Sequence, residues 1–378
     1  MAKANLAAAM QTSVRKAIQT VSPTGNAMVP EGRTKVEKVI IISKQSVGDI
    51  VMLTAGIRDL KASVPALQID VHTPFPELWQ NNPNLTILPK DDPSIPVVEA
   101  HYPLIQQSNQ QPWHFIHGYR KFFEELFHIP IPQGAFRGDI HLSLEEQNSQ
   151  EIFKKFGIDA PGYGIIISGG KSDFTTKIFD HTKLQEVVDR TKGKIRWVQI
   201  GGKSSKFDEN AHLHKDLTGV INTVGQTTIR EMIQLIYWSN LVLTPISAAM
   251  HLAEAIKAYP EATFVHRPTV VLAGGRESPT WEAYPHHRFL HSVGTLKCCF
   301  DGGCWRNRVT DLGDGKDDPK MNCFLPILKE HGQTVPKCLD DISVDMILNE
   351  IGSYYRSGVH TDGNQIAVLK YDDNSFSL

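Results

Sequence analysis

Cysteine residues are confined to one part of this chain. All five lie between Cys298 and Cys338. Four residues separate Cys299 from Cys304, and Cys323 and Cys338 follow. Cysteines that only fill an apolar core would be scattered, whereas clustered thiolates are ligands of zinc and iron. The pattern predicts one structural metal ion held by Cys299, Cys304, Cys323 and Cys338, with Cys298 as the alternative first ligand. The spacing does not choose between iron and zinc.

The segment around these cysteines, residues 296–340, has little hydrophobic material. It contains several glycines and the turn-rich run 313–319, so it needs a cross-link to hold its shape. The chain carries no predicted export signal, which disfavours disulfides. Four protein ligands would close the site and leave no open position for catalysis. Because the segment is remote in sequence from the other candidate groups, metal loss is expected to reduce solubility, assembly or thermal stability first.

A second candidate group is Gly48–Asp49, which follows four β-branched residues at 39–42. Such a run predicts a strand buried on both faces. Apolar residues at 50, 53, 57 and 60 then predict a helix with one apolar face. Gly48 leaves the backbone open to a ligand. Asp49 could cap the helix, because a carboxylate in the first turn complements the helix dipole, or it could act as a general base.

A third candidate group is a glycine-rich loop that follows the predicted strand 164–168. It contains Gly169, Gly170, Lys171 and Lys177. Backbone N–H groups beside glycines, with a lysine near a helix start, can hold phosphate. The spacing does not match a Walker A loop.

The elements that would position these groups alternate between strand and helix. Most strands end in a small or glycine-rich turn, as in a parallel sheet whose ligands bind at one edge. Residues 97–119 are irregular and aromatic, and we interpret them as a loop and helix suited to acceptor contacts. The further predicted strands are 67–71, 86–88, 197–200, 241–244 and 269–272, and the further predicted helices are 181–190, 228–239, 247–256 and 340–355.

The predicted domain organisation is two similar α/β modules. It comprises an N-terminal extension and linker (1–35), an N-terminal Rossmann-like domain (36–155), a C-terminal Rossmann-like domain (156–358) that contains the cysteine segment 296–340, and a polar tail (359–378).

The composition of the 378-residue chain is that of an ordinary globular protein, with 41% hydrophobic and 21% charged residues. A net charge of −2 gives no basic field for nonspecific nucleic-acid binding. No apolar run reaches the length of a membrane span, and no secretory signal is present at the N-terminus, so we expect a cytoplasmic protein.

Several of these motifs together resemble glycosyltransferase family 9, which contains the ADP-heptose heptosyltransferases. They are residues 46–50, the Lys177 region and the strand and helix from Thr244 to His251. More specific segments resemble the branch of bacterial autotransporter heptosyltransferases, which carry a cysteine-bound iron. These segments are residues 114–118, 138–142, 273–277, 281–287 and 298–305.

This resemblance implies the GT-B fold, with two doubly wound Rossmann-like domains facing across a cleft and a cysteine-rich metal-binding insertion. It implies that 36–155 is the acceptor domain and 156–358 the nucleotide-sugar domain. It implies an inverting enzyme that needs no catalytic divalent metal. Asp49 matches the catalytic base and Lys177 the phosphate lysine. The expected donor is a nucleotide sugar, with ADP-heptose favoured. The expected acceptor is a protein or glycan, the expected metal is iron, and a homo-oligomer is expected.

One departure from the family pattern concerns the stretch from Thr244 to His251. The family often has Asp-Thr-Gly before a Ser-His pair, whereas here Thr244-Pro-Ile-Ser247 is followed by a longer helix entry. His251 on an apolar helix would usually be a core residue, but the motif favours a donor contact. The full set of predicted donor-binding residues is Gly48, Gly169, Gly170, Lys171, Lys177, Gly202, Thr244, Ser247 and His251.

Three alternatives remain open from the sequence. The same fold could use another nucleotide sugar with a small-molecule, lipid or nucleic-acid acceptor. The chain could also be a non-catalytic nucleotide-binding scaffold, although the presence of both Asp49 and Lys177 argues against that. A dehydrogenase is disfavoured, because neither module has a G-x-G-x-x-G motif followed by an acid about 20 residues later.

Overall fold

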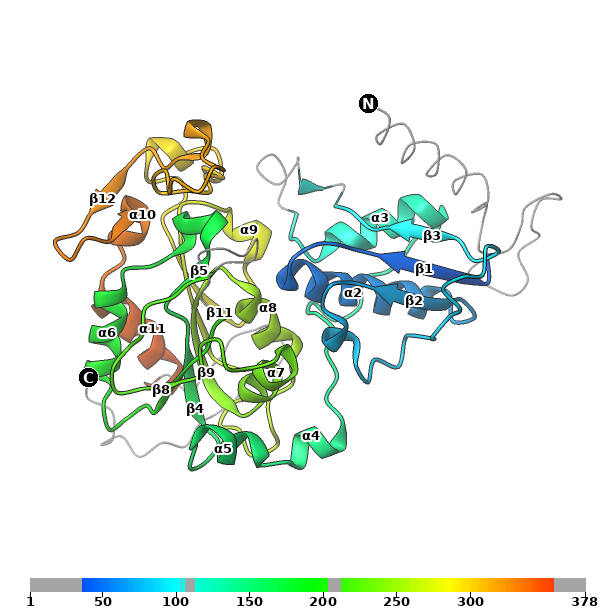
Figure 1. Cartoon of the computed structure of the whole chain (residues 1–378), viewed down its shortest axis with the longest axis horizontal. Helices are drawn as coiled ribbons and strands as arrows, with labels where there is room; N and C mark the ends of the chain where they lie inside the picture. Colours follow the sequence, from blue (N-terminus) through cyan, green and yellow to red (C-terminus); the bar gives the residue numbers. More distant parts are fainter. Residues whose placement is uncertain (1–35, 103, 106–112, 203–211, 357–378) are drawn as a thin grey trace. The chain divides into compact units, whose positions relative to one another are not determined.

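The structure is a computed structural model that describes residues 36–102, 104–105, 113–202 and 212–356. The predicted extension 1–35 and tail 359–378 lie outside the described residues, as does part of the predicted acceptor loop 97–119. The chain divides into two compact units, Met1–Ser143 and Leu144–Leu378, and each is described by itself (Figure 1).

The first unit contains a three-stranded parallel sheet. Strand β1 (Lys38–Ile42) lies between β2 (Gln68–His72) and β3 (Val97–Glu99). Val39 and Ile41 of β1 are fully buried, which confirms the strand predicted from the β-branched run.

The strand predicted over residues 86–88 is wrong. These residues form a loop beside β2, in which the Thr86 N–H donates to the Ile69 carbonyl (2.8 Å) and the Leu88 N–H donates to the Asp70 carboxylate (3.0 Å). The third strand is β3, inside the stretch interpreted as loop and helix. Its three residues are too few to display a strand period.

Two helices of the first unit pack closely against each other. Helix α2 (Val47–Ser63) buries the apolar positions predicted for it, and α3 (His117–Phe127) lies beside it. A Cβ atom on Gly56 would lie only 2.9 Å from the Cβ of Tyr119, so a glycine at this position permits the approach. A short 3₁₀ helix, η1 (Pro76–Trp79), follows β2.

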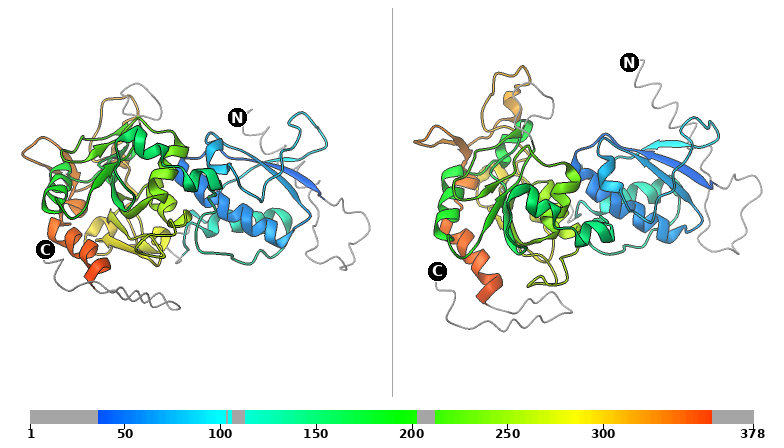
Figure 2. Two further views of the ribbon diagram at one scale, coloured as in Figure 1. Left: turned by 90° about the horizontal axis from the view of Figure 1, so that it is seen from below. Right: turned by 60° about the horizontal axis from the view of Figure 1, so that its bottom comes forward.

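The second unit contains a six-stranded parallel sheet in the order β11-β10-β9-β4-β6-β8. Helices α6 and α11 cover one face, and α7 and α8 cover the other (Figure 1). Figure 2 again shows the orange-red α11 beside α6. This is the predicted α/β fold with helices on both faces. The strands are β4 (Tyr163–Ile166), β6 (Trp197–Gln199), β8 (Ile221–Asn222), β9 (Ser239–Pro245), β10 (Thr269–Gly274) and β11 (His287–His291). The helices are α4 (Leu144–Asn148), α5 (Glu151–Phe156), α6 (His181–Arg190), α7 (Ile229–Tyr237), α8 (Ala248–Ala255), α9 (Pro279–Glu282) and α11 (Val344–Arg356).

A buried arginine joins the ends of two of these helices. The guanidinium of Arg267 donates to the carbonyl of Tyr237 at the end of α7 (3.2 Å) and to those of Ala253 and Ile256 at the end of α8 (2.7 and 3.0 Å). Carbonyls at a helix C-terminus have no partner within the helix and carry a partial negative charge. The Arg267 guanidinium therefore gives hydrogen-bond partners and an opposite charge to the carbonyls at both helix ends.

The cysteine segment contains only short regular elements. They are η4 (Lys297–Cys299), η5 (Pro319–Met321), the antiparallel pair β12 (Pro326–Leu328) and β13 (Thr334–Pro336), and α10 (Lys337–Asp340). Phe300, Phe324 and Leu328 are exposed by 74%, 60% and 72%, which agrees with a segment that has little core of its own.

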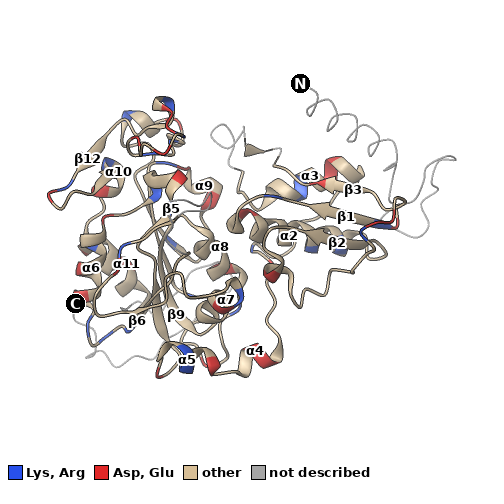
Figure 3. Cartoon of the chain, viewed as in Figure 1, with Lys and Arg blue, Asp and Glu red and all other residues tan. Residues whose placement is uncertain are grey.

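The distribution of charged residues and the hydropathy of the helices are those expected from the composition of an ordinary globular protein. Basic and acidic residues are interspersed over both units (Figure 3). Within the described ranges, every helix is too short or too polar to cross a lipid bilayer.

Candidate functional site

Asp49 lies in the first turn of α2, directly after the carboxyl end of β1, and is half-buried. Both oxygens of its carboxylate accept hydrogen bonds. The Ser46 N–H donates to Oδ2 (3.0 Å), and the Tyr102 hydroxyl donates to Oδ1 (2.6 Å). The Ser46 bond is the backward bond of a capping box, so Asp49 does cap the helix. A cap does not need the second bond, from a residue 53 positions away.

Lys177, the last residue of η3 (Ser172–Lys177), is paired with a buried carboxylate. Its Nζ lies 3.0 Å from Oε1 of Glu277 and 5.5 Å from the centre of the Phe174 ring. Glu277 also forms an ion pair with Arg276. Two cations around one carboxylate leave an excess positive charge, and such a group can attract an anion.

Arg276 follows the carboxyl end of β10 and is buried. Its Nε donates to the Arg306 carbonyl (2.7 Å), and its Nη2 donates to Oδ1 of Asn307 (2.8 Å). Burial lowers the pKa of Arg276 to about 10, although the nearby Cys304 and Glu282 charges act to raise it. The guanidinium is therefore still charged at neutral pH.

Sequence reasoning gave no role to Arg276 and Glu277. Their segment, 273–277, was noted only for its resemblance. The available signal was their place directly after a buried parallel strand, where ligands of α/β sheets bind.

Thr244, Ser247 and His251 come from the end of β9 and from α8. The hydroxyls of Thr244 and Ser247 share a hydrogen bond of 2.8 Å. Both ring nitrogens of the buried His251 face protein groups. Nδ1 lies 2.9 Å from the Tyr284 hydroxyl, and Nε2 lies 3.1 Å from Oε2 of Glu282. The network around His251 thus supplies a structural reason for a histidine at this position. Its contact with a donor stays a prediction.

The glycine-rich loop is organised by a small sheet. Gly170 and Lys171 form β5, which pairs with β7 (His212–Leu213). A Cβ atom on Gly169 would lie 1.7 Å from the Leu213 carbonyl oxygen, and one on Gly202 would lie 2.8 Å from the His212 ring. Close packing therefore explains these two glycines without a ligand. Their predicted role in donor binding, like that of Gly48, stays a prediction.

A pocket of about 570 Å³ lies beside this small sheet. Its lining mixes apolar and polar side chains and does not include Lys177, Thr244 or His251. The lining residues are Ser168, Thr175, Ile178, His181, His212, Leu213, His214, Lys215, Val309, Thr310, Leu312, Gln333 and Thr334.

Four of the five cysteines line one small cavity of about 10 Å³, close to the space that a single water molecule occupies. They are Cys298, Cys304, Cys323 and Cys338. Burial raises the pKa of Cys338 to about 12, and the nearby Cys304, Cys323 and Cys298 thiolates act in the same direction. None of the five cysteines forms a disulfide bond.

Cys299 is arranged differently from its neighbour Cys298. Its thiol is buried and donates to the carbonyls of Ser292 and Leu296 at 3.4 Å each. The geometry thus favours the alternative first ligand, Cys298. Among the described residues, the groups of three whose ligand atoms lie within 4.8 Å of one another contain no cysteine, so the four thiols surround the cavity without converging on one point. In type and number, these four thiols fit a closed thiolate site for zinc or iron.

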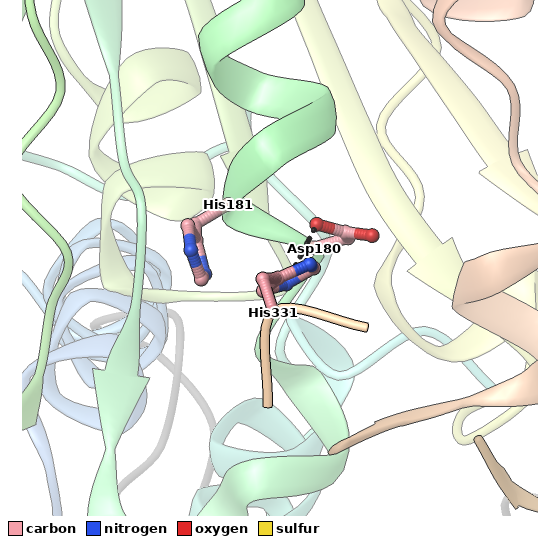
Figure 4. A group of neighbouring side chains, drawn as sticks. All are labelled: Asp180, His181 and His331. Carbon is pink, nitrogen blue, oxygen red and sulfur yellow. Dashed lines mark ion pairs between the residues drawn. The ribbon is translucent and has the colours of Figure 1, made fainter. Parts of the chain in front are cut away.

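The two groups that do lie within 4.8 Å contain histidines and a carboxylate. In the first, Asp180 and His331 lie 3.5 Å apart, and His181 lies beside them (Figure 4). The ammonium of Lys329 is 3.6 Å from Oδ2 of Asp180, where it competes with a metal cation. In the second group, Glu254 pairs with the buried His287 (3.4 Å) and lies near His266 and His286. In both groups the carboxylate is paired with side chains of the protein, so its position is explained without a metal ion.

Replacing Asp180 with alanine is expected to lower the free energy of unfolding by about 1–2 kcal/mol, because Asp180 caps α6. Its Oδ1 accepts from the N–H and the hydroxyl of Thr182 (2.8 and 2.7 Å). Burial alone would raise the pKa of Asp180, but the Thr182 hydrogen bonds and the His331 and Lys329 charges hold it below its usual range. The stabilisation is therefore complete above about pH 4 and is lost as the pH falls through the folded-state pKa. Urea unfolding at pH 7 and pH 3 measures both effects, and an equal cost at both pH values contradicts the assignment.

Comparison with known families gives one match. Residues 103–262 match the model of glycosyltransferase family 9 (heptosyltransferase). This stretch includes Lys177, Thr244, Ser247 and His251. A search of curated proteins gives no match.

Comparison with solved structures gives similar folds at low sequence identity. A glycosyl transferase family 9 protein from Veillonella parvula has a TM-score of 0.56 at 14% identity, over 87% of this chain and 98% of that protein. TibC from enterotoxigenic E. coli, described as an iron-containing dodecameric glycosyltransferase, has a TM-score of 0.54 at 15% identity, over 85% of this chain and 77% of TibC. TibC in complex with ADP-D-β-D-heptose has a TM-score of 0.55 at 12% identity, over 87% of this chain and 81% of the TibC chain. At these identities the likeness establishes the α/β glycosyltransferase fold.

Proposed function

Because residues 103–262 match the family 9 model, we propose that this chain is a glycosyltransferase of that family. We propose that it transfers heptose from ADP-heptose to an acceptor hydroxyl, with inversion at the anomeric carbon. The comparisons support the family expected from the sequence motifs, whereas the donor, the acceptor and the stereochemistry belong to the proposal. The observation that carries it is the group of two cations, Lys177 and Arg276, around the buried carboxylate of Glu277. Excess positive charge at strand ends of an α/β sheet suits a nucleoside diphosphate.

Asp49 is the proposed general base. Its carboxylate takes the proton of the acceptor hydroxyl while that oxygen forms a bond to the anomeric carbon. The bond between the anomeric carbon and the diphosphate breaks on the opposite face, which inverts the configuration. The leaving ADP carries the electron pair, and Lys177 and Arg276 offset its charge together with the N-terminus of α8, near Ser247. Protein charges then perform the role that a divalent cation performs in other transferases.

We also propose that Cys298, Cys304, Cys323 and Cys338 hold one iron or zinc ion. The ion would supply a cross-link between strands of a segment that has little core, and its closed ligand set leaves no position for substrate. TibC, which shares the fold, is described as iron-containing, and this favours iron.

The acceptor is proposed to be a hydroxyl of a protein or glycan, and the assembly a homo-oligomer. TibC is described as dodecameric. The exposed side chains of Phe300, Phe324 and Leu328 in the cysteine segment are apolar surface of the kind that association covers. Analytical ultracentrifugation measures the assembly, and a monomer at micromolar concentration contradicts this part of the proposal.

The experiment that tests the proposed function follows ADP release from a panel of nucleotide sugars. ADP-heptose is expected to be turned over fastest, with slow hydrolysis when no acceptor is present. NMR of the released or transferred sugar reports its anomeric configuration. If no nucleotide sugar in the panel releases its nucleotide, the chain is a binding protein and the proposal fails.

Replacing Lys177 with alanine is expected to weaken ADP binding by roughly 10- to 100-fold, the scale of one charge-assisted hydrogen bond. Titration calorimetry measures the Kd. Lys155→Ala is the matched control, because Lys155 also pairs with a glutamate, Glu231, and lies over the Phe156 ring. Unchanged affinity in Lys177→Ala would remove Lys177 from the donor site.

A further inference from the structure

A half-buried tyrosine is bonded to the proposed base. The Tyr102 hydroxyl donates to Oδ1 of Asp49 at 2.6 Å, within the range of a charge-assisted O–H···O⁻ bond. Helix capping does not account for this bond, because the Ser46 N–H already occupies Oδ2, and one such bond completes the cap.

The position of the Tyr102 ring is fixed by its neighbours. Its centroid lies 4.5 Å from that of Phe115 and 4.5 Å from that of Tyr119. A Cβ atom on Gly118 would lie 2.8 Å from the Tyr102 ring, so a side chain at position 118 would displace it. Phe115 and Gly118 belong to the 114–118 motif, which the proposed function leaves unexplained. Holding Tyr102 is a physical reason for both residue types.

We propose that Tyr102 is a positioning residue that orients the Asp49 carboxylate for proton transfer. One bond at each oxygen, from Ser46 and from Tyr102, opposes rotation of the carboxylate about its terminal torsion. A carboxylate oxygen has more than one lone-pair direction, so an oxygen that accepts one hydrogen bond can also take up a proton. The inference rests on the proposed function, since it assumes that Asp49 is the base.

Tyr102 acts as a hydrogen-bond donor and not as a second base. Burial raises the pKa of Tyr102 well above 10, and Tyr119 and Asp49 add to the shift. The phenol therefore stays protonated throughout the working pH range. Tyr119 also responds to the Asp49 charge, and burial raises its pKa as well. Neither tyrosine changes its charge near neutral pH, so a pH effect of removing the Tyr102 hydroxyl reports on Asp49.

The test is Tyr102→Phe, which keeps the ring and removes the hydroxyl. We expect kcat for ADP release from ADP-heptose to fall roughly tenfold, with little change in the KM for ADP-heptose, because the base is less well oriented. The acidic limb of the kcat/KM profile is expected to move to higher pH, since the carboxylate loses a bond that favours its charged form. Tyr163→Phe is the matched control. It removes a buried tyrosine hydroxyl, which donates to the Leu235 carbonyl in the second unit (2.8 Å), and is expected to leave the profile unchanged.

A second measurement does not depend on turnover. In protein carrying ¹³C-labelled aspartate, the Asp49 carboxyl signal is identified by its absence in Asp49→Asn, and its titration midpoint is expected to rise in Tyr102→Phe. If Asp49→Asn retains full activity, the proposed base fails. If activity depends on Asp49 but Tyr102→Phe changes neither the rate, the pH profile nor the midpoint, only the role of Tyr102 is overturned.

Discussion

Replacing Asp49 with asparagine is expected to lower turnover by roughly two to four powers of ten, the usual contribution of a general base. Asparagine has nearly the same shape, and its one oxygen can still accept from one of the two donors, Ser46 or Tyr102, but it cannot take up the acceptor proton. ADP affinity should stay unchanged, because the proposed diphosphate contacts belong to residues of the second unit. The rate of ADP release from ADP-heptose and the Kd of ADP measure the two effects.

The competing explanation is that Asp49 only caps α2. Asp180→Asn is the matched control, since Asp180 caps α6 and has no proposed role in the reaction. A cap that loses its charge changes stability and leaves the rate alone. If Asp49→Asn behaves in the same way, with normal turnover and a shifted melting temperature, Asp49 is a cap and the base must be sought elsewhere.

The fold was most predictable where strands are buried on both faces. Runs of β-branched residues identified β1 and β4, and the helix predicted over 181–190 is present as α6, His181–Arg190. Prediction failed at β3, where three residues carry no period and only pairing with β1 makes a strand. The prediction of a strand at 86–88 failed for a different reason. Hydrogen bonds to β2 hold this apolar stretch as a loop.

For the candidate site, the positions of residues in the fold were predictable where sequence order along an element is enough, while their roles belong to the proposal. Asp49 and Lys177 both follow a strand at its carboxyl end, and sequence order shows that. Glu277 and Tyr102 were missed because their partners, Lys177 and Asp49, are far away in the sequence. The choice between Cys298 and Cys299 was equally out of reach, since neighbouring residues of a 3₁₀ turn direct their side chains differently.

The structure also revises where the cysteine segment acts. The sequence places it apart from the predicted donor-binding residues, but in the second unit it packs against Arg276 and against Thr176, the neighbour of Lys177. The Thr176 hydroxyl and the Arg276 guanidinium both donate to the Arg306 carbonyl (2.6 and 2.7 Å), and the Cys304 N–H donates to the Gly275 carbonyl (3.2 Å). Arg276 is the ion-pair partner of Glu277. Disorder in this segment would therefore release Arg276 from the proposed diphosphate site.

Removing the metal ligands should consequently affect stability and donor binding together. In serine variants of Cys298, Cys304, Cys323 and Cys338, we expect the purified protein to lose about one iron or zinc per chain, as a closed four-ligand site requires. The melting temperature is expected to fall by roughly 10 °C, the shift that about 3–4 kcal/mol produces in a unit of this size. The Kd of ADP should rise in the same variants. Elemental analysis, thermal unfolding and titration calorimetry measure the three quantities.

Cys299→Ser separates the two assignments of the first ligand. Because the Cys299 thiol donates to the Ser292 and Leu296 carbonyls, a serine hydroxyl can replace it, and this variant should keep its metal and its ADP affinity. Loss of the metal in Cys299→Ser together with its retention in Cys298→Ser would reverse the assignment. Wild-type protein that contains no metal, unfolds at its normal temperature and has freely titrating thiols would refute the site as a whole. A metal lost without any change in the Kd of ADP would confine its role to stability and break the proposed link from Cys304 to Arg276.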